Sequence, residues 1–117
     1  MYEEFVQEAS RLFAASLRHD RPQPQLDHCF DLQVDGNIIH ARHLAGKPAP
    51  DIYLMAAKLL GVGPARTVVI EDALSGVEAG AAGNFGLVIG VARKGNAEEL
   101  TQQGAHLVVK DLGELVD

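Results

Sequence analysis

The apolar residues in the second half of the chain form short runs that alternate with longer amphipathic or small-residue segments. Three of the runs are rich in β-branched residues, as is typical of strands buried on both faces of a sheet. The segments between them have helical spacing and end close to glycines. The pattern predicts strands over residues 67–70, 87–91 and 106–109, and helices over residues 51–60, 74–82, 96–103 and 111–116. Strands alternating with helices predict an α/β fold with a parallel sheet flanked by helices.

The first 28 residues have a different pattern. Apolar residues recur at three- and four-residue spacing over residues 2–18, which predicts a helix, although residues 12–16 also fit a short strand. Residues 19–28 are polar and contain Pro22 and Pro24, so we expect a linker there. Residues 29–34 fit a further strand. We therefore divide the chain into residues 1–28, a helix with a proline-containing linker, and residues 29–117, an α/β core.

Composition narrows the class of protein. The chain has 117 residues, of which 47% are hydrophobic and 22% charged, values typical of one small globular domain. The net charge is −6, and Lys and Arg form no run, so nucleic acid is not an expected partner. The N-terminus has no uninterrupted apolar stretch, so we expect neither a signal peptide nor a membrane span. The single cysteine, Cys29, fits a reducing cytoplasm and is interpreted as buried and structural.

Two adjacent acids, Glu71 and Asp72, come directly after the predicted strand over residues 67–70. In open α/β sheets, ligands bind beyond the carboxyl ends of the strands. Adjacent carboxylates there repel each other unless a cation or a base lies between them. Hard oxygen ligands of this kind suit Mg²⁺, which keeps several waters and binds phosphate substrates. Position alone equally allows one of the two acids to cap the helix that begins near Leu74.

Lys47 lies between Gly46 and Pro48, just before the predicted helix over residues 51–60. A lysine fixed at such a junction can place its ammonium on a phosphate or neutralise neighbouring carboxylates. By itself, a lone lysine is better explained as a solvated surface residue.

Together these features resemble the haloacid dehalogenase (HAD) family of hydrolases. Residues 46–54, with Lys47-Pro48 and Pro50-Asp51, resemble its third motif, and residues 68–79, with Glu71-Asp72, resemble its fourth. Residues 88–91 and 104–112 are similar to the segments that follow in the family. The order and spacing agree over residues 41–117, and the paired acids point to the β-phosphoglucomutase-like branch. The resemblance implies a Rossmann-like parallel sheet flanked by helices, in this chain as a truncated HAD core without a cap domain.

The resemblance also implies roles for individual residues. Lys47 would be catalytic, because it would stabilise charge on the nucleophile and on the transferred phosphoryl group. Glu71 and Asp72 would hold Mg²⁺, directly or through water. Ser75 and Gly76 would shape the backbone around the phosphate site. The implied substrate is a small phosphorylated metabolite of the sugar-phosphate type.

One expected part of the family pattern is missing from the sequence. Members of the family use an aspartate nucleophile and a second aspartate two residues later. This chain has no such pair, and the nearest stretch, Val34-Asp35-Gly36, has Gln33 in the nucleophile position. The phosphate-binding Ser or Thr of the second motif has one candidate here, Ser16.

The missing strand has consequences for assembly and function. In the family, the nucleophile strand is central and lies beside the strand that ends in the paired acids, so its loss would leave two exposed sheet edges. The N-terminal segment, a second copy of the chain or a complementing chain would cover those edges, or the fold would rearrange. We therefore expect a Mg²⁺-dependent phosphatase or phosphomutase core that is weak or inactive alone. The alternative is a non-catalytic remnant, or half of a split enzyme, that binds phosphate, metal or a partner chain.

Overall fold

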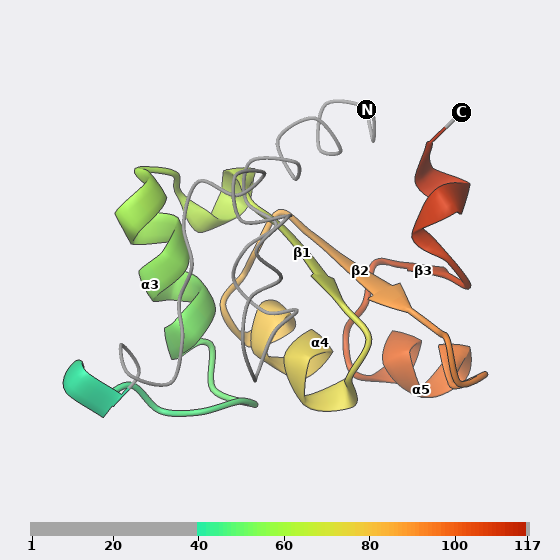
Figure 1. The fold of residues 1–117 in the computed structure, drawn as a ribbon, viewed down its shortest axis with the longest axis horizontal. Helices are drawn as coiled ribbons and strands as arrows, with labels where there is room; N and C mark the ends of the chain where they lie inside the picture. The colour runs from blue at the N-terminus through green and yellow to red at the C-terminus, as the bar shows by residue number, and fades with distance from the viewer. Residues whose placement is uncertain (1–39, 117) are drawn as a thin grey trace, which may run out of the picture.

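The computed structural model describes residues 40–116, and Figure 1 shows their arrangement. The expectations for residues 1–28 and 29–34, including those for Ser16 and Cys29, lie outside the described residues.

The described part of the chain is built on a parallel sheet of three strands in the order β1-β2-β3. The strands are β1 (Val68–Glu71), β2 (Leu87–Val91) and β3 (Leu107–Val109). Val68 of β1 lies opposite Leu87 of β2, and at the other end of the pair Glu71 lies opposite Gly90. Because all three strands run in the same direction, their carboxyl ends meet at one edge of the sheet. The predicted α/β fold with a Rossmann-like parallel sheet is confirmed.

Helices connect the strands and cover one face of the sheet. The helix α4 (Leu74–Ala82) joins β1 to β2, and α5 (Ala97–Gln102) joins β2 to β3. Both pack below the sheet in the view of Figure 1, and α3 (Asp51–Leu60) packs against α4. Two 3₁₀ helices complete the described elements: η2 (Pro64–Arg66) and η3 (Leu112–Leu115). Within residues 40–116, no helix has both the length and the apolar composition needed to cross a bilayer.

Side chains along each strand point alternately to the two faces of the sheet, so the core has one apolar layer on each face. Val69 and Val88 point to the side of α3, α4 and α5, where they pack with Tyr53, Phe85 and Leu100. Their sequence neighbours point to the opposite face, where they form a second apolar cluster with η3: Val68, Ile70, Leu87, Ile89, Val91, Leu107, Val109, Leu112 and Leu115. This two-residue period places residue 71 on the same face as residue 69, the face that the helices cover.

Two elements, β1 and the C-terminal helix, differ from the predictions in their bounds or type. The strand predicted over residues 67–70 lies one residue later, because Glu71 itself pairs with Gly90 and belongs to β1. The terminal helix predicted over residues 111–116 is present only as the short 3₁₀ helix η3, Leu112–Leu115. That segment forms only a 3₁₀ turn, whose N-cap Asp111 accepts a hydrogen bond from the Gly113 N–H (2.6 Å) and donates its own N–H to Glu114 (3.0 Å). This reciprocal capping satisfies N–H groups at the start of the turn.

Candidate functional site

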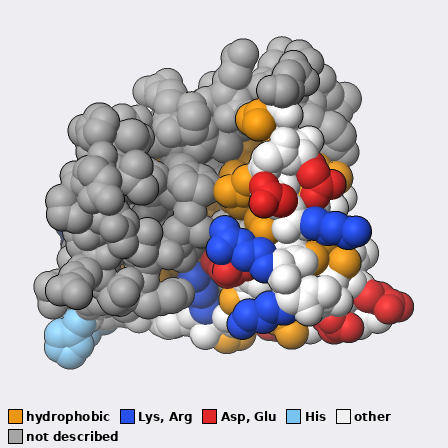
Figure 2. Space-filling view, turned by 45° about the vertical axis from the view of Figure 1, so that its right-hand side comes forward, with side chains coloured by type: hydrophobic (Ala, Val, Ile, Leu, Met, Phe, Trp, Pro, Cys, Tyr) orange, Lys and Arg blue, Asp and Glu red, His pale blue; other side chains and the backbone are white. Residues whose placement is uncertain are grey.

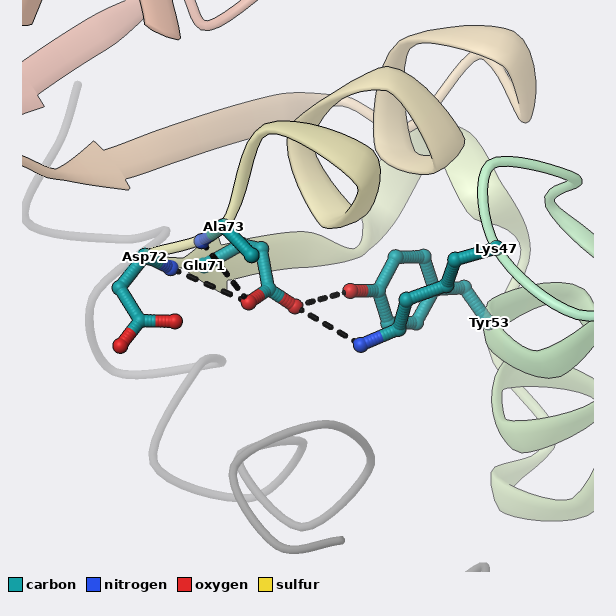
Figure 3. Close-up of polar contacts among 5 residues, drawn as sticks. All are labelled: Lys47, Tyr53, Glu71, Asp72 and Ala73. Atoms are coloured by element: carbon teal, nitrogen blue, oxygen red, sulfur yellow. Dashed lines mark hydrogen bonds and ion pairs between the residues drawn. The ribbon is translucent and has the colours of Figure 1, made fainter. Parts of the chain in front are cut away.

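The carboxylate of Glu71 is the centre of the candidate site. Glu71 is the last residue of β1, and only 2% of it is exposed. Its Oε2 accepts hydrogen bonds from Lys47 Nζ (3.1 Å) and from the Tyr53 hydroxyl (2.5 Å). Its Oε1 accepts from the backbone N–H groups of Asp72 (3.1 Å) and Ala73 (3.3 Å). Figure 3 shows the carboxylate lying between the turn that leads into α4 and the two side chains from the α3 region.

Gly76 provides the space that this carboxylate occupies. Gly76 is buried in the first turns of α4, beneath the Glu71 side chain. A Cβ at position 76 would lie 2.1 Å from both Cγ and Cδ of Glu71 and 2.3 Å from its Oε2. No real Cβ tolerates such distances, so only glycine allows Glu71 to turn inward at this point. Gly76 therefore acts on the site by making room for Glu71.

Lys47 reaches Glu71 from the loop that precedes α3. The loop is closed by Asp51, the first residue of the helix, whose Oδ2 accepts from the Ala45 N–H at 3.0 Å. Lys47 lies inside a tight turn. In this turn the Ala49 N–H donates to the Gly46 carbonyl at 3.0 Å. The Lys47 side chain is 12% exposed, so it is mostly but not fully shielded from solvent. The predicted meeting of Lys47 with the acids at the end of β1 is observed for Glu71.

The Lys47–Glu71 ion pair is a buried charge pair with nearly complete hydrogen bonding. A carboxylate has about four acceptor positions, and the four contacts to Glu71 fill them. Such pairs form only where hydrogen bonds replace the water lost on burial. An ammonium carries three N–H donors, and within residues 40–116 the hydrogen-bond acceptor of Lys47 is Glu71. The pair therefore presents a fixed, partly exposed cation at the carboxyl edge of the sheet.

The structure separates the two adjacent acids. Asp72 is exposed, and Figure 3 shows its carboxylate extending on the far side of Glu71 from Lys47. With the acceptor positions of Glu71 filled, Asp72 is the acid whose oxygens remain for a cation. No group of three or more His, Cys, Asp or Glu side chains that could hold a metal exists within residues 40–116. Ser75 is exposed in the first turn of α4, on the same turn as Gly76.

Tyr53 is the site residue that the sequence analysis did not assign. It lies on the buried face of α3, only 3% of it is exposed, and its hydroxyl is part of the Glu71 contact. Its place in the third motif was visible, but an aromatic residue on an apolar helix face is normally a core residue. The signal that distinguishes it is the polar hydroxyl, since a buried tyrosine hydroxyl needs a hydrogen-bond partner.

The described part of the face in Figure 2 carries charges of both signs. On the described part of the face in Figure 2, basic and acidic side chains are intermixed. No single-sign patch of the kind that binds a nucleic-acid backbone is present on that part of the face.

Known proteins resemble this chain in sequence and in fold. Residues 6–84 match the family profile of haloacid dehalogenase-like hydrolases. Over 94 residues the chain is 52% identical to the beta-phosphoglucomutase of Mycobacterium bovis, and the match covers 78% of this chain and 36% of that protein. A phosphorylated carbohydrates phosphatase of Thermotoga maritima is 37% identical over 86 residues, which is 73% of this chain and 38% of the relative. A HAD family hydrolase from Deinococcus radiodurans, crystallised with bound phosphate and sodium, superposes with a TM-score of 0.66 at 34% identity, covering 78% of this chain and 41% of that one.

The chain belongs to the haloacid dehalogenase-like hydrolase family. Within it, the chain falls in the β-phosphoglucomutase-like branch. The match begins at residue 6, well before residues 41–117 on which the sequence resemblance was founded. The chain spans about a third of the curated relatives that it matches, with 36% of the beta-phosphoglucomutase covered, and its described part is a partial HAD core.

Proposed function

We propose that this chain forms the phosphate- and metal-binding part of a Mg²⁺-dependent phosphatase or phosphomutase site for small sugar phosphates. The observation that carries the proposal is the Lys47 ammonium, anchored at 3.1 Å on a 2%-exposed glutamate at the carboxyl end of β1. Ligands of open α/β sheets bind at this edge. Proteins similar to this chain include a phosphatase of phosphorylated carbohydrates and a hydrolase crystallised with bound phosphate.

Lys47 would bind the phosphoryl oxygens of the substrate. Glu71 fixes the position of the ammonium, and the contact with Glu71 Oε2 uses one of its three N–H donors, so two are left to bind phosphoryl oxygens in this proposal. Phosphoryl transfer depends mainly on positioning and on electrostatic stabilisation of the oxygens, with little other chemistry required of the protein. A cation held in place before the substrate arrives serves both needs.

Asp72 would hold Mg²⁺ in this site. Asp72 is exposed next to the end of β1, whereas the Glu71 oxygens are engaged with Lys47, Tyr53 and two backbone N–H groups. A single carboxylate fits Mg²⁺, which takes one or two protein carboxylates and completes its shell with water and phosphate oxygens. When bound, Mg²⁺ supplies charge neutralisation of the phosphate. In this proposal Glu71 supports the metal site indirectly, by fixing the backbone that carries Asp72.

The central prediction concerns Lys47. Inorganic phosphate titrated calorimetrically into the chain in the presence of MgCl₂ is expected to bind, and Lys47→Ala is expected to weaken that binding roughly tenfold or more, because charge-assisted hydrogen bonds to phosphate are lost. Lys58→Ala is the matched control, since Lys58 is an exposed lysine in the last turn of the same helix region. Equal affinities for the wild type and Lys47→Ala would refute phosphate binding at this site.

A second candidate function is supported by the sequence itself, which contains no Asp-x-Asp pair to serve as nucleophile and acid. In that case the chain binds phosphate, Mg²⁺ or a complementing chain, or pairs with a second copy, without turnover. Phosphate release from p-nitrophenyl phosphate separates the two candidates. The enzymatic candidate expects slow release that Mg²⁺ stimulates and that Asp72→Asn removes, with Glu78→Gln, an exposed acid on α4, as control. The non-catalytic candidate expects no release while Lys47-dependent phosphate binding persists.

A further inference from the structure

Tyr53 contacts both members of the Lys47–Glu71 pair. Its hydroxyl donates to Glu71 Oε2 at 2.5 Å, the same oxygen that accepts from Lys47 at 3.1 Å. Lys47 Nζ also lies 5.3 Å from the centroid of the Tyr53 ring. One side chain therefore holds the acceptor of the lysine through its hydroxyl and attracts the lysine through its ring.

The ring of Tyr53 is itself fixed from behind. It packs edge-on against Phe85, with 6.0 Å between ring centroids and an interplanar angle of 89°. Both aromatic residues belong to the apolar cluster between the sheet and the helices, and only 3% of Tyr53 and 4% of Phe85 are exposed. Rigid packing of this kind keeps the hydroxyl aimed at one point beneath the carboxyl edge of β1.

A fixed aromatic partner matters because a lysine ammonium sits on a flexible four-carbon chain. Glu71 restrains one N–H donor, which leaves the ammonium free to pivot about that contact. The ring gives it a second, broader point of attraction, and the hydroxyl stops the Glu71 carboxylate from rotating away.

We propose that Tyr53 is a positioning residue for Lys47, which holds the ammonium in the orientation that receives a phosphoryl oxygen. The proposal rests on the proposed phosphate-binding function and assigns to this tyrosine the task of orienting the cation. The residue does not touch the phosphate, because its hydroxyl is directed at Glu71 and its ring is buried.

Tyr53→Phe tests the proposal, since it removes the hydroxyl and keeps the ring and its packing on Phe85. Phosphate affinity measured with inorganic phosphate and MgCl₂ is expected to fall roughly three- to tenfold, the loss of one hydrogen bond to a charged group. In the phosphate-free chain, the ¹⁵Nζ resonance of the Lys47 ammonium is expected to be sharp in the wild type and broadened in Tyr53→Phe. The Lys58 ammonium, exposed on α3, gives the unchanged reference signal.

A second comparison separates positioning from a merely structural role. In the Lys47→Ala background, Tyr53→Phe is expected to change phosphate affinity no further, because the group that it positions is absent. A structural role predicts a lower melting temperature, an unchanged Lys47 signal and the same affinity loss in both backgrounds, and that result would overturn the proposal.

The experiments distinguish a failure of the proposed phosphate binding from a failure of the positioning role of Tyr53. If the wild type does not bind inorganic phosphate but Tyr53→Phe broadens the Lys47 resonance, the positioning role stands and the proposed phosphate binding falls. If phosphate binds through Lys47 while Tyr53→Phe leaves both the resonance and the affinity unchanged, the positioning role alone is overturned.

Discussion

Replacing Glu71 with alanine is expected to lower the free energy of unfolding by about 3–5 kcal/mol, the range measured when one partner of a buried ion pair is removed. The substitution leaves the ammonium of Lys47, whose side chain is only 12% exposed, without its carboxylate. It also removes the acceptor of the Tyr53 hydroxyl and of two backbone N–H groups at the end of β1. Urea unfolding followed by circular dichroism measures the effect in a chain without tryptophan.

Two further variants test whether the loss of stability comes from the buried carboxylate of Glu71. Glu71→Gln keeps the shape and one acceptor oxygen, so its loss of stability is expected to be smaller than that of Glu71→Ala. Glu78→Ala removes an exposed glutamate from α4 and is expected to change the free energy of unfolding by no more than about 0.5 kcal/mol. A loss below about 1 kcal/mol for Glu71→Ala would mean that the carboxylate is not buried among these partners.

The second large effect is expected for Gly76→Ala. The new methyl group would meet Glu71 Cγ and Cδ at 2.1 Å, so the carboxylate must leave its position or α4 must shift away from β1. Overpacking and partial loss of the buried pair together are expected to lower the free energy of unfolding by about 2–4 kcal/mol, although alanine is the better helix former. The same urea unfolding experiment measures this loss, and phosphate affinity should fall with it because Lys47 loses its anchor.

A neighbouring glycine and a double substitution test the reason. Gly80 lies one turn further along α4, where a Cβ would meet Val88 Cγ2 at 3.1 Å and Val69 Cγ1 at 3.3 Å, distances that small shifts of these side chains relieve. Gly80→Ala is therefore expected to change stability by less than about 1 kcal/mol. In the Glu71→Ala background, Gly76→Ala is expected to be neutral, because its clash partner is gone. A full loss in that background would show that Gly76 serves another contact.

The fold could be predicted from the sequence because local residue patterns determine most of its helices and strands. The helix over residues 51–60 ends where the pattern places it, since Gly61 adopts the left-handed conformation (φ 74°) that stops a helix. The buried run over residues 87–91 became the central strand, apolar on both faces. The terminal segment was predicted less well, because the propensity of residues 111–116 for helix does not reveal that Asp111 and Glu114 cap a single turn.

Only part of the site could be predicted from the sequence. The resemblance brought Lys47 to the end of β1, but the sequence treated Glu71 and Asp72 as equivalent acids. The alternation of side chains along the strand separates them: residue 71 continues β1 toward α3 and α4, and residue 72 begins the turn. The strand boundary was predicted one residue early, so this distinction was out of reach. The part played by Tyr53 depends on packing across α3 and β1, which no local pattern encodes.

A crystal structure of the chain grown with MgCl₂ and inorganic phosphate tests the central claim most directly. The account predicts a phosphate oxygen within hydrogen-bonding distance of Lys47 Nζ, while the same ammonium remains on Glu71 Oε2 and Asp72 faces the bound ion. Lys47 and Glu71 found apart from each other, with phosphate bound elsewhere or absent from the carboxyl edge of β1, would contradict it.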